Sequence, residues 1–145
     1  MATPFSEIFD RAIFKFADYS FRDDLTPEER DKVLVRYLIS AKTDFAPTCL
    51  IDLNDYDLVT QQFNQTLDDE IIEILSVGVA YYWLSYKTLN SRLLKNNLVS
   101  KDYHYYSPAN LLKEIQTLRQ TLGREFKKKI IDYSFEHSNL DQVQV

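Results

Sequence analysis

Apolar residues return every three or four positions in four stretches of the chain, which is the period of an α-helix. These stretches cover residues 4–18, 26–44, 66–96 and 107–134. The third is apolar around most of its circumference, which is typical of a helix surrounded by other helices. In the fourth, the apolar positions keep the helical step over several turns: Leu111, Ile115, Leu118, Leu122, Phe126, Ile130 and Tyr133. The pattern predicts an all-α protein, a small bundle of about four helices with a long central helix and a long C-terminal helix.

Each stretch begins with a signal for the start of a helix. A hydroxyl residue that can cap the helix is followed by a proline at Thr3-Pro4, Thr26-Pro27 and Ser107-Pro108. The third stretch has the same capping logic at residues 66–69. Pro47 ends the second helix before about Asp44, because the residue before a proline avoids the helical conformation.

Three features lie outside this regular pattern. The segment from Cys49 to Gln65 is the least regular; within it, Leu58 to Phe63 fits either one helical turn or a short extended piece, and the sequence leaves it open. The last residues, 136–145, are polar and predict a flexible C-terminal tail after a single helical domain at 1–135. Gly78 falls in the middle of the third helix, where we expect another helix to approach closely.

Composition and charge narrow the class of protein. With 45% hydrophobic residues in 145, the chain can bury a core without disulfides, and it has only one cysteine, Cys49, which we interpret as a buried apolar residue. The longest nearly uncharged stretch, 74–86, is shorter than the roughly 20 residues that cross a bilayer, so we expect no membrane contact. Residues 1–75 carry 16 acids and 7 bases, a net charge of −9, whereas residues 76–145 carry 6 acids and 10 bases, a net charge of +4.

Candidate chemistry is sparse. His104 and His137 have no partner at metal-ligand spacing, and the acid pairs at the starts of helices complement the helix dipole. The basic cluster 124–129 is explained by the dipole at the end of the last helix, with nucleic-acid binding as the alternative. We therefore expect no catalytic, cofactor-binding or metal-binding residues and no enzymatic activity.

Aromatic and apolar residues near the end of the chain are the candidates for binding a partner. They either form a contact surface or close over the end of the bundle, and the sequence does not decide between the two. These candidate partner-binding residues are Tyr103, Tyr105, Tyr106, Tyr133, Phe135, Leu140, Val143 and Val145.

Several short motifs in the C-terminal half resemble the small head–tail connector proteins of tailed bacteriophages. The similarity covers residues 67–135, and the N-terminal half agrees only in helix order. The motifs are Trp83-Leu84, Asn90-Ser91, Leu94, Asp102-Tyr103, Tyr106-Ser107-Pro108-Ala109-Asn110-Leu111-Leu112-Lys113, Leu118-Arg119 and Ile130-Ile131-Asp132-Tyr133-Ser134-Phe135.

The resemblance implies a structural virion protein of the neck, an adaptor or head-completion protein assembled in the host cytoplasm. Its implied partners are the portal protein, neighbouring neck and tail proteins, and copies of itself in an oligomeric ring of about twelve subunits. DNA would pass through the lumen without sequence-specific binding. The implied docking segments are the tail after Ser134 and the stretch 49–65. The alternative hypothesis is a small phage-encoded regulatory binder or inhibitor of a host protein.

Overall fold

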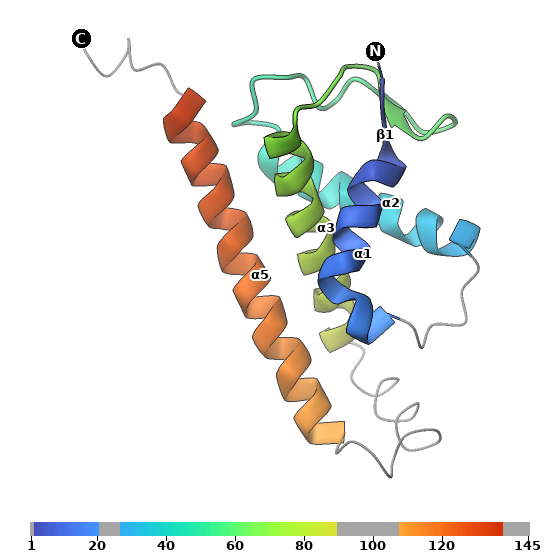
Figure 1. Ribbon diagram of the computed structural model, residues 1–145, viewed down its shortest axis with the longest axis vertical. Coiled ribbons are helices and arrows are strands. Elements are labelled where there is room, and N and C mark those ends of the chain that lie inside the picture. Colours follow the sequence, from blue (N-terminus) through green and yellow to red (C-terminus); the bar gives the residue numbers. More distant parts are fainter. Residues whose placement is uncertain (1, 21–26, 90–107, 138–145) are drawn as a thin grey trace.

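The computed structural model describes residues 2–20, 27–89 and 108–137. Within these ranges the chain forms four helices: α1 (Phe5–Ser20), α2 (Pro27–Phe45), α3 (Asp69–Leu89) and α5 (Pro108–His137) (Figure 1). The predicted all-α fold with a long central and a long C-terminal helix is confirmed.

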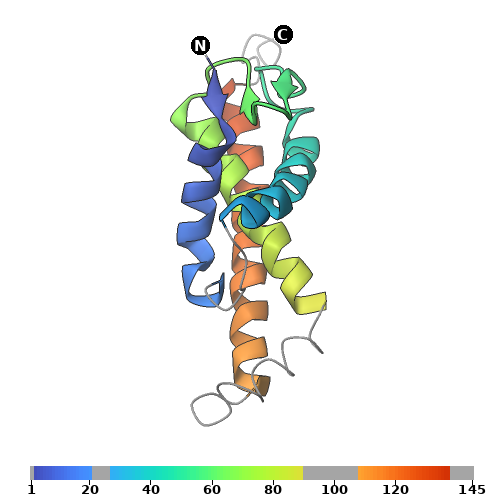
Figure 2. The same ribbon diagram turned by 90° about the vertical axis from the view of Figure 1, so that its right-hand side faces the viewer.

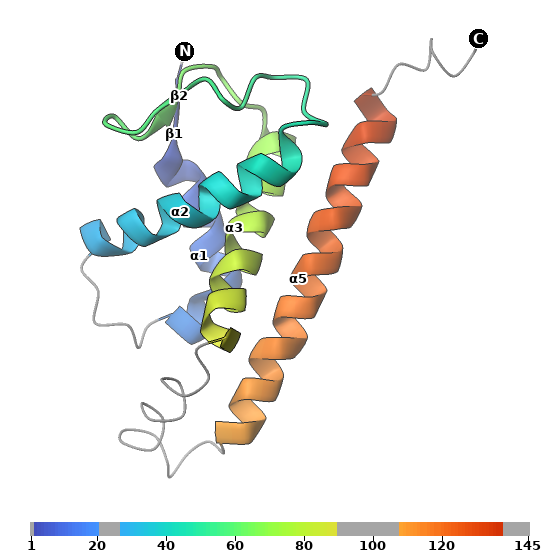
Figure 3. The same ribbon diagram turned by 180° about the vertical axis from the view of Figure 1, so that it is seen from behind.

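The central position of α3 is the organising feature of the fold. α1, α2 and α5 all pack against α3, whereas α1 and α2 touch each other little. α1 and α2 lie on either side of α3 (Figure 2), and α2 crosses it steeply (Figure 3). α5 runs antiparallel to α3, so the start of α3 and the end of α5 lie at the same end of the molecule (Figure 1). The buried hydrophobic side chains of α3 are Ile71, Ile72, Ile74, Leu75, Val77, Val79, Ala80, Trp83 and Leu84.

Gly78 marks the point where three helices meet. A Cβ atom added to Gly78 would lie 2.6 Å from Cβ of Ala41 in α2 and 2.8 Å from the ring of Phe126 in α5. Real Cβ atoms do not approach other atoms so closely, so a side chain here would push the helices apart. The expected close approach at Gly78 is confirmed.

Helix boundaries agree with the start signals at two places. α2 begins at Pro27 and α5 begins at Pro108. α3 is capped by Asp68, whose Oδ1 accepts a hydrogen bond from the backbone N–H of Ile71 at 2.9 Å. α3 is described as far as Leu89, and the expected continuation to residue 96 lies outside the described residues.

The N-terminus differs from the prediction. Thr3 and Pro4 form β1 (Thr3–Pro4) instead of the cap and first turn of α1. β1 pairs antiparallel with β3 (Gln62–Phe63), which also pairs with β2 (Tyr56–Asp57), in the order β1-β3-β2. The Thr3 hydroxyl accepts a hydrogen bond from the backbone of Leu67 and donates one to the carbonyl of Gln65. Contacts with a segment some 60 residues away therefore outweigh the local capping preference.

The segment that the sequence left open contains the short β2–β3 hairpin. Between the two strands, Gln61 has a φ of 54°, in the left-handed region. Its carbonyl accepts a hydrogen bond from the backbone N–H of Phe5, the first residue of α1. The Lys42 ammonium of α2 donates to the Asn54 side chain at 2.8 Å and lies over the ring of Tyr56. These contacts hold the hairpin on the end of the bundle where the N-terminus lies (Figure 1).

Candidate functional site

The candidate partner-binding residues fall into three groups according to where the structure places them. Tyr103, Tyr105 and Tyr106, and likewise Leu140, Val143 and Val145, lie outside the described residues. Phe135 lies on the surface of α5 and is 73% exposed. Tyr133 is 2% exposed and belongs to the core.

Tyr133 requires a correction, because it offers no surface to a partner. Its ring meets the ring of Phe45 edge to face, with centroids 5.0 Å apart. Its hydroxyl accepts a hydrogen bond from the backbone N–H of Leu50 at 3.2 Å, and the Cys49 thiol lies 3.9 Å away. Burial raises the pKa of Tyr133, and it also raises the pKa of the half-buried Cys49 thiol. Tyr133 thus fastens the loop after α2 to α5.

The end of α5 also differs from the expected domain boundary. The helix continues to His137, two residues past the boundary placed at 135. The basic cluster 124–129 therefore lies more than one turn before the helix end, too far for the dipole to explain it, since that effect is confined to the last turn.

One face of α5 combines this basic cluster with exposed apolar side chains. Ile131 and Phe135 are four residues apart, so they lie next to each other on the helix surface, and they are 53% and 73% exposed. Arg124, Lys127 and Lys128 are exposed and precede them at helical spacing. We call these five residues the α5 face.

A second exposed face, on α1, has the opposite charge. Phe14 is 88% exposed, the largest such fraction for an aromatic residue in the described part of the chain. Glu7 and Asp10 are exposed and precede it by seven and four residues, which places all three on one side of the helix. We call these three residues the α1 face. The exposed charges of the α1 face are thus opposite in sign to those of the α5 face.

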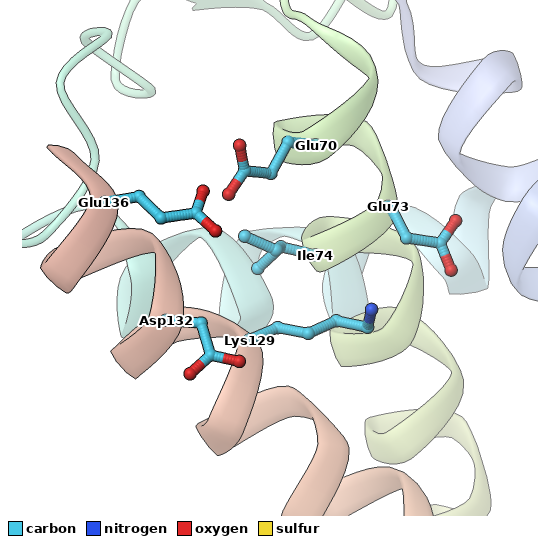
Figure 4. A pocket seen from close by; sticks show the side chains of 6 residues that line it. All are labelled: Glu70, Glu73, Ile74, Lys129, Asp132 and Glu136. Atoms are coloured by element: carbon cyan, nitrogen blue, oxygen red, sulfur yellow. The ribbon is translucent and has the colours of Figure 1, made fainter.

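An acidic pocket lies between α3 and α5 (Figure 4). It has a volume of about 230 Å³ and is lined by Glu70, Glu73, Ile74, Lys129, Asp132 and Glu136. The carboxylates of Glu70 and Glu136 point toward each other across it (Figure 4). His137 adds an imidazole whose Nε2 lies 3.3 Å from Oε2 of Glu70. The ring of His137 packs on the ring of Tyr133, with centroids 4.2 Å apart.

The sequence analysis missed this cluster. Asp69 and Glu70 do lie in the first turn of α3, as the dipole argument predicted. However, Glu70 is 67 positions from His137 along the chain, and only the antiparallel packing of α3 and α5 brings them together. The adjacent Glu136-His137 pair is the only local signal, and by itself it is weak.

Glu73 connects the pocket to α1. Lys15 Nζ lies 2.6 Å from one of its carboxylate oxygens, and Arg11 Nη1 lies 3.4 Å from the other. Arg11 also reaches Asp69 at 2.9 Å. Partial burial raises the pKa of Glu73, but the hydrogen bonds and charges of Lys15 and Arg11 outweigh it and hold the pKa below its ordinary value of 4.5. This network fastens α1 to the first turns of α3.

The lowered pKa of Glu73 gives a prediction for acid unfolding. A carboxyl with a lowered folded-state pKa stabilises the fold above its unfolded-state pKa, and that stability is lost as the pH falls through the folded-state pKa. Glu73→Gln is expected to cost on the order of 1 kcal/mol or less at pH 7. The difference from the wild type should shrink as the pH falls below 4.5. Urea unfolding of both proteins between pH 7 and pH 3 measures this, and a difference independent of pH would contradict the network.

Comparison with known proteins gives no relative. No protein-family model, no curated protein and no solved structure matches the chain. None of the helices in the described residues is both long and apolar enough to cross a membrane.

Proposed function

We propose that this chain is a structural protein of the head–tail junction of a tailed bacteriophage. It would form an oligomeric ring in the neck of the virion, bind the portal and join the tail by protein–protein contacts alone. The resemblance of residues 67–135 to head–tail connector proteins supports the phage assignment. The main support for a role in protein–protein binding is the α5 face, where two large apolar side chains lie exposed beside three cations.

The two charged faces suit a ring subunit. In a ring, each copy contacts the next through two different surfaces, which have to be complementary. The α5 face is basic and the α1 face is acidic, and each carries an exposed aromatic side chain. Fully burying a Phe or Ile side chain contributes about 1.5–3 kcal/mol, and opposite charges speed and orient the encounter. The α5 face of one copy would therefore pack on the α1 face of the next, or on a partner of similar acidity such as the portal.

The net charge of the chain agrees with the proposed relation to DNA. Sequence-independent DNA binding depends on cations that neutralise phosphates, and the whole chain carries a net charge of −5. A ring of such subunits would let DNA pass through its lumen without holding it. Sequence-specific binding plays no part in the proposal.

Size-exclusion chromatography with light scattering, with and without portal particles, tests this function. The wild type is expected to form rings or to bind the portal. The double variant Ile131→Ala/Phe135→Ala should weaken that association at least about tenfold, a loss of 1.4 kcal/mol or more. Thr43→Ala, an exposed change on α2, outside both the α5 face and the α1 face, is the control and should associate like the wild type.

Two results would contradict the proposal. One is a wild-type protein that stays monomeric and does not bind the portal at any concentration tested. The other is a double variant that associates as tightly as the wild type. Binding to a host enzyme together with absence from purified phage particles would favour the regulatory binder instead.

A further inference from the structure

We infer that Glu70, Glu136 and His137 form a binding site for a divalent transition-metal ion. One ligand atom from each side chain, two carboxylate oxygens and one imidazole nitrogen, lies within 4.8 Å of the others. None of its residues belongs to the α5 face or the α1 face, so the site can be tested separately from the proposed role in the phage neck.

The three side chains come together at the end of the seam between two antiparallel helices. Glu70 lies in the first turn of α3, and Glu136 and His137 lie in the last turn of α5. The carboxylates of Glu70 and Glu136 point toward each other, an arrangement in which two carboxylates repel each other (Figure 4). A divalent cation between them would replace this repulsion by attraction to both.

The spacing of the donors suits a small metal ion. Zinc binds imidazole nitrogen and carboxylate oxygen at about 2.0–2.2 Å, so neighbouring ligands of a tetrahedral site lie about 3.4 Å apart. His137 Nε2 and Glu70 Oε2 are already 3.3 Å apart. Glu136 is exposed, so a change of its rotamer can close the remaining distance without moving the backbone. Three protein ligands leave a fourth position for water or for a group from a bound partner.

The kind of donor selects the class of metal. One imidazole with two carboxylates suits Zn²⁺, Co²⁺ or Ni²⁺, whereas Ca²⁺ takes six or more oxygen ligands. The packing of the His137 ring on the ring of Tyr133, itself fixed in the core, restricts how the imidazole can turn. Among the described residues that line the pocket, Lys129 is the one cation; its Nζ lies 3.7 Å from Oε1 of Glu125 on the previous turn of α5, and its charge also acts on Glu73. The site thus has a held imidazole and a surplus of negative charge.

Titration of the full-length protein with ZnCl₂ in a calorimeter tests the site, and Co²⁺ absorption gives the coordination geometry. We expect one equivalent to bind, with a tetrahedral Co²⁺ spectrum and a perturbed ring signal of one histidine only in NMR spectra. His137→Gln and Glu70→Gln should each weaken binding at least about tenfold. His104→Gln is the matched control, because it removes the only other histidine of the chain.

Circular dichroism of each variant without metal separates loss of the site from loss of the fold. A folded His137→Gln protein that still binds Zn²⁺ like the wild type would overturn the inference. So would binding that is lost with His104→Gln, or a wild type that binds no Zn²⁺. Because no part of this test involves the portal, its failure leaves the proposed function unaffected.

Discussion

Replacing Phe126 by alanine is expected to lower the free energy of unfolding by about 3–5 kcal/mol, the usual cost of emptying a core phenylalanine site. Phe126 is 4% exposed, and its ring fills the space opposite Gly78, where α3 and α5 pack. The backbones of α3 and α5 cannot move together to fill the cavity that the truncation leaves, because α2 also packs on α3 at Gly78. For a domain whose total stability is about 5–15 kcal/mol, this loss threatens folding itself.

The matched control for this prediction is Phe135→Ala, in the same helix. Phe135 is 73% exposed, so its truncation should change the stability by no more than about 0.5 kcal/mol. Urea unfolding followed by circular dichroism measures both. Equal destabilisation by the two changes would contradict the assignment of Phe126 to the core and of Phe135 to the surface.

Gly78→Ala is expected to destabilise the protein by about 1–3 kcal/mol, although alanine is the better helix former. The added methyl group would lie 2.6 Å from Cβ of Ala41. Since that atom is attached directly to the backbone of α2, relief requires a shift of the helix. A preference of about 1 kcal/mol for alanine in a helix offsets only part of this cost.

Gly123→Ala is the control, because Gly123 is the only other glycine of the chain and it also lies inside a helix. Its added methyl group would lie 2.8 Å from the ring of Tyr81, a half-buried side chain that has to shift, whereas at Gly78 the obstacle includes the Cβ atom of Ala41. Gly123→Ala should therefore cost less than Gly78→Ala and leave the stability within about 1 kcal/mol of the wild type. Thermal unfolding of the two variants is the measurement, and a more stable Gly78→Ala protein would contradict the close approach of the helices.

The sequence predicted those parts of the fold that local rules determine. Helical periodicity located the four helices that the described ranges contain, and the proline signals located the starts of α2 and α5. The position of Gly78 indicated a close approach because few other reasons favour a glycine in the middle of a buried helix. These features depend on residues within one or two helical turns of each other, so the pattern along the chain contains them.

The features that the sequence could not predict depend on contacts between distant segments. Thr3 has the chemistry of a helix cap, but its hydroxyl is bound by Gln65 and Leu67, so it lies in a strand. Tyr133 continues an apolar stripe and also has a polar tip, which fits either a core or a surface. In the structure Tyr133 belongs to the core, because the backbone N–H of Leu50, in the loop after α2, donates a hydrogen bond to the Tyr133 hydroxyl. Likewise, the sequence offered His137 no partner at metal-ligand spacing, and its partner Glu70 lies on α3, 67 positions away along the chain.

We propose that this protein acts through its surfaces, as a subunit of a phage neck. The most direct test of this proposal is quantitative mass spectrometry of purified phage particles, with the portal protein as the internal standard. We expect the chain to be present at a fixed stoichiometry of about one copy per portal subunit, as stacked rings of matching symmetry require. Its absence from complete particles, while it is abundant in the infected cell, would contradict the claim.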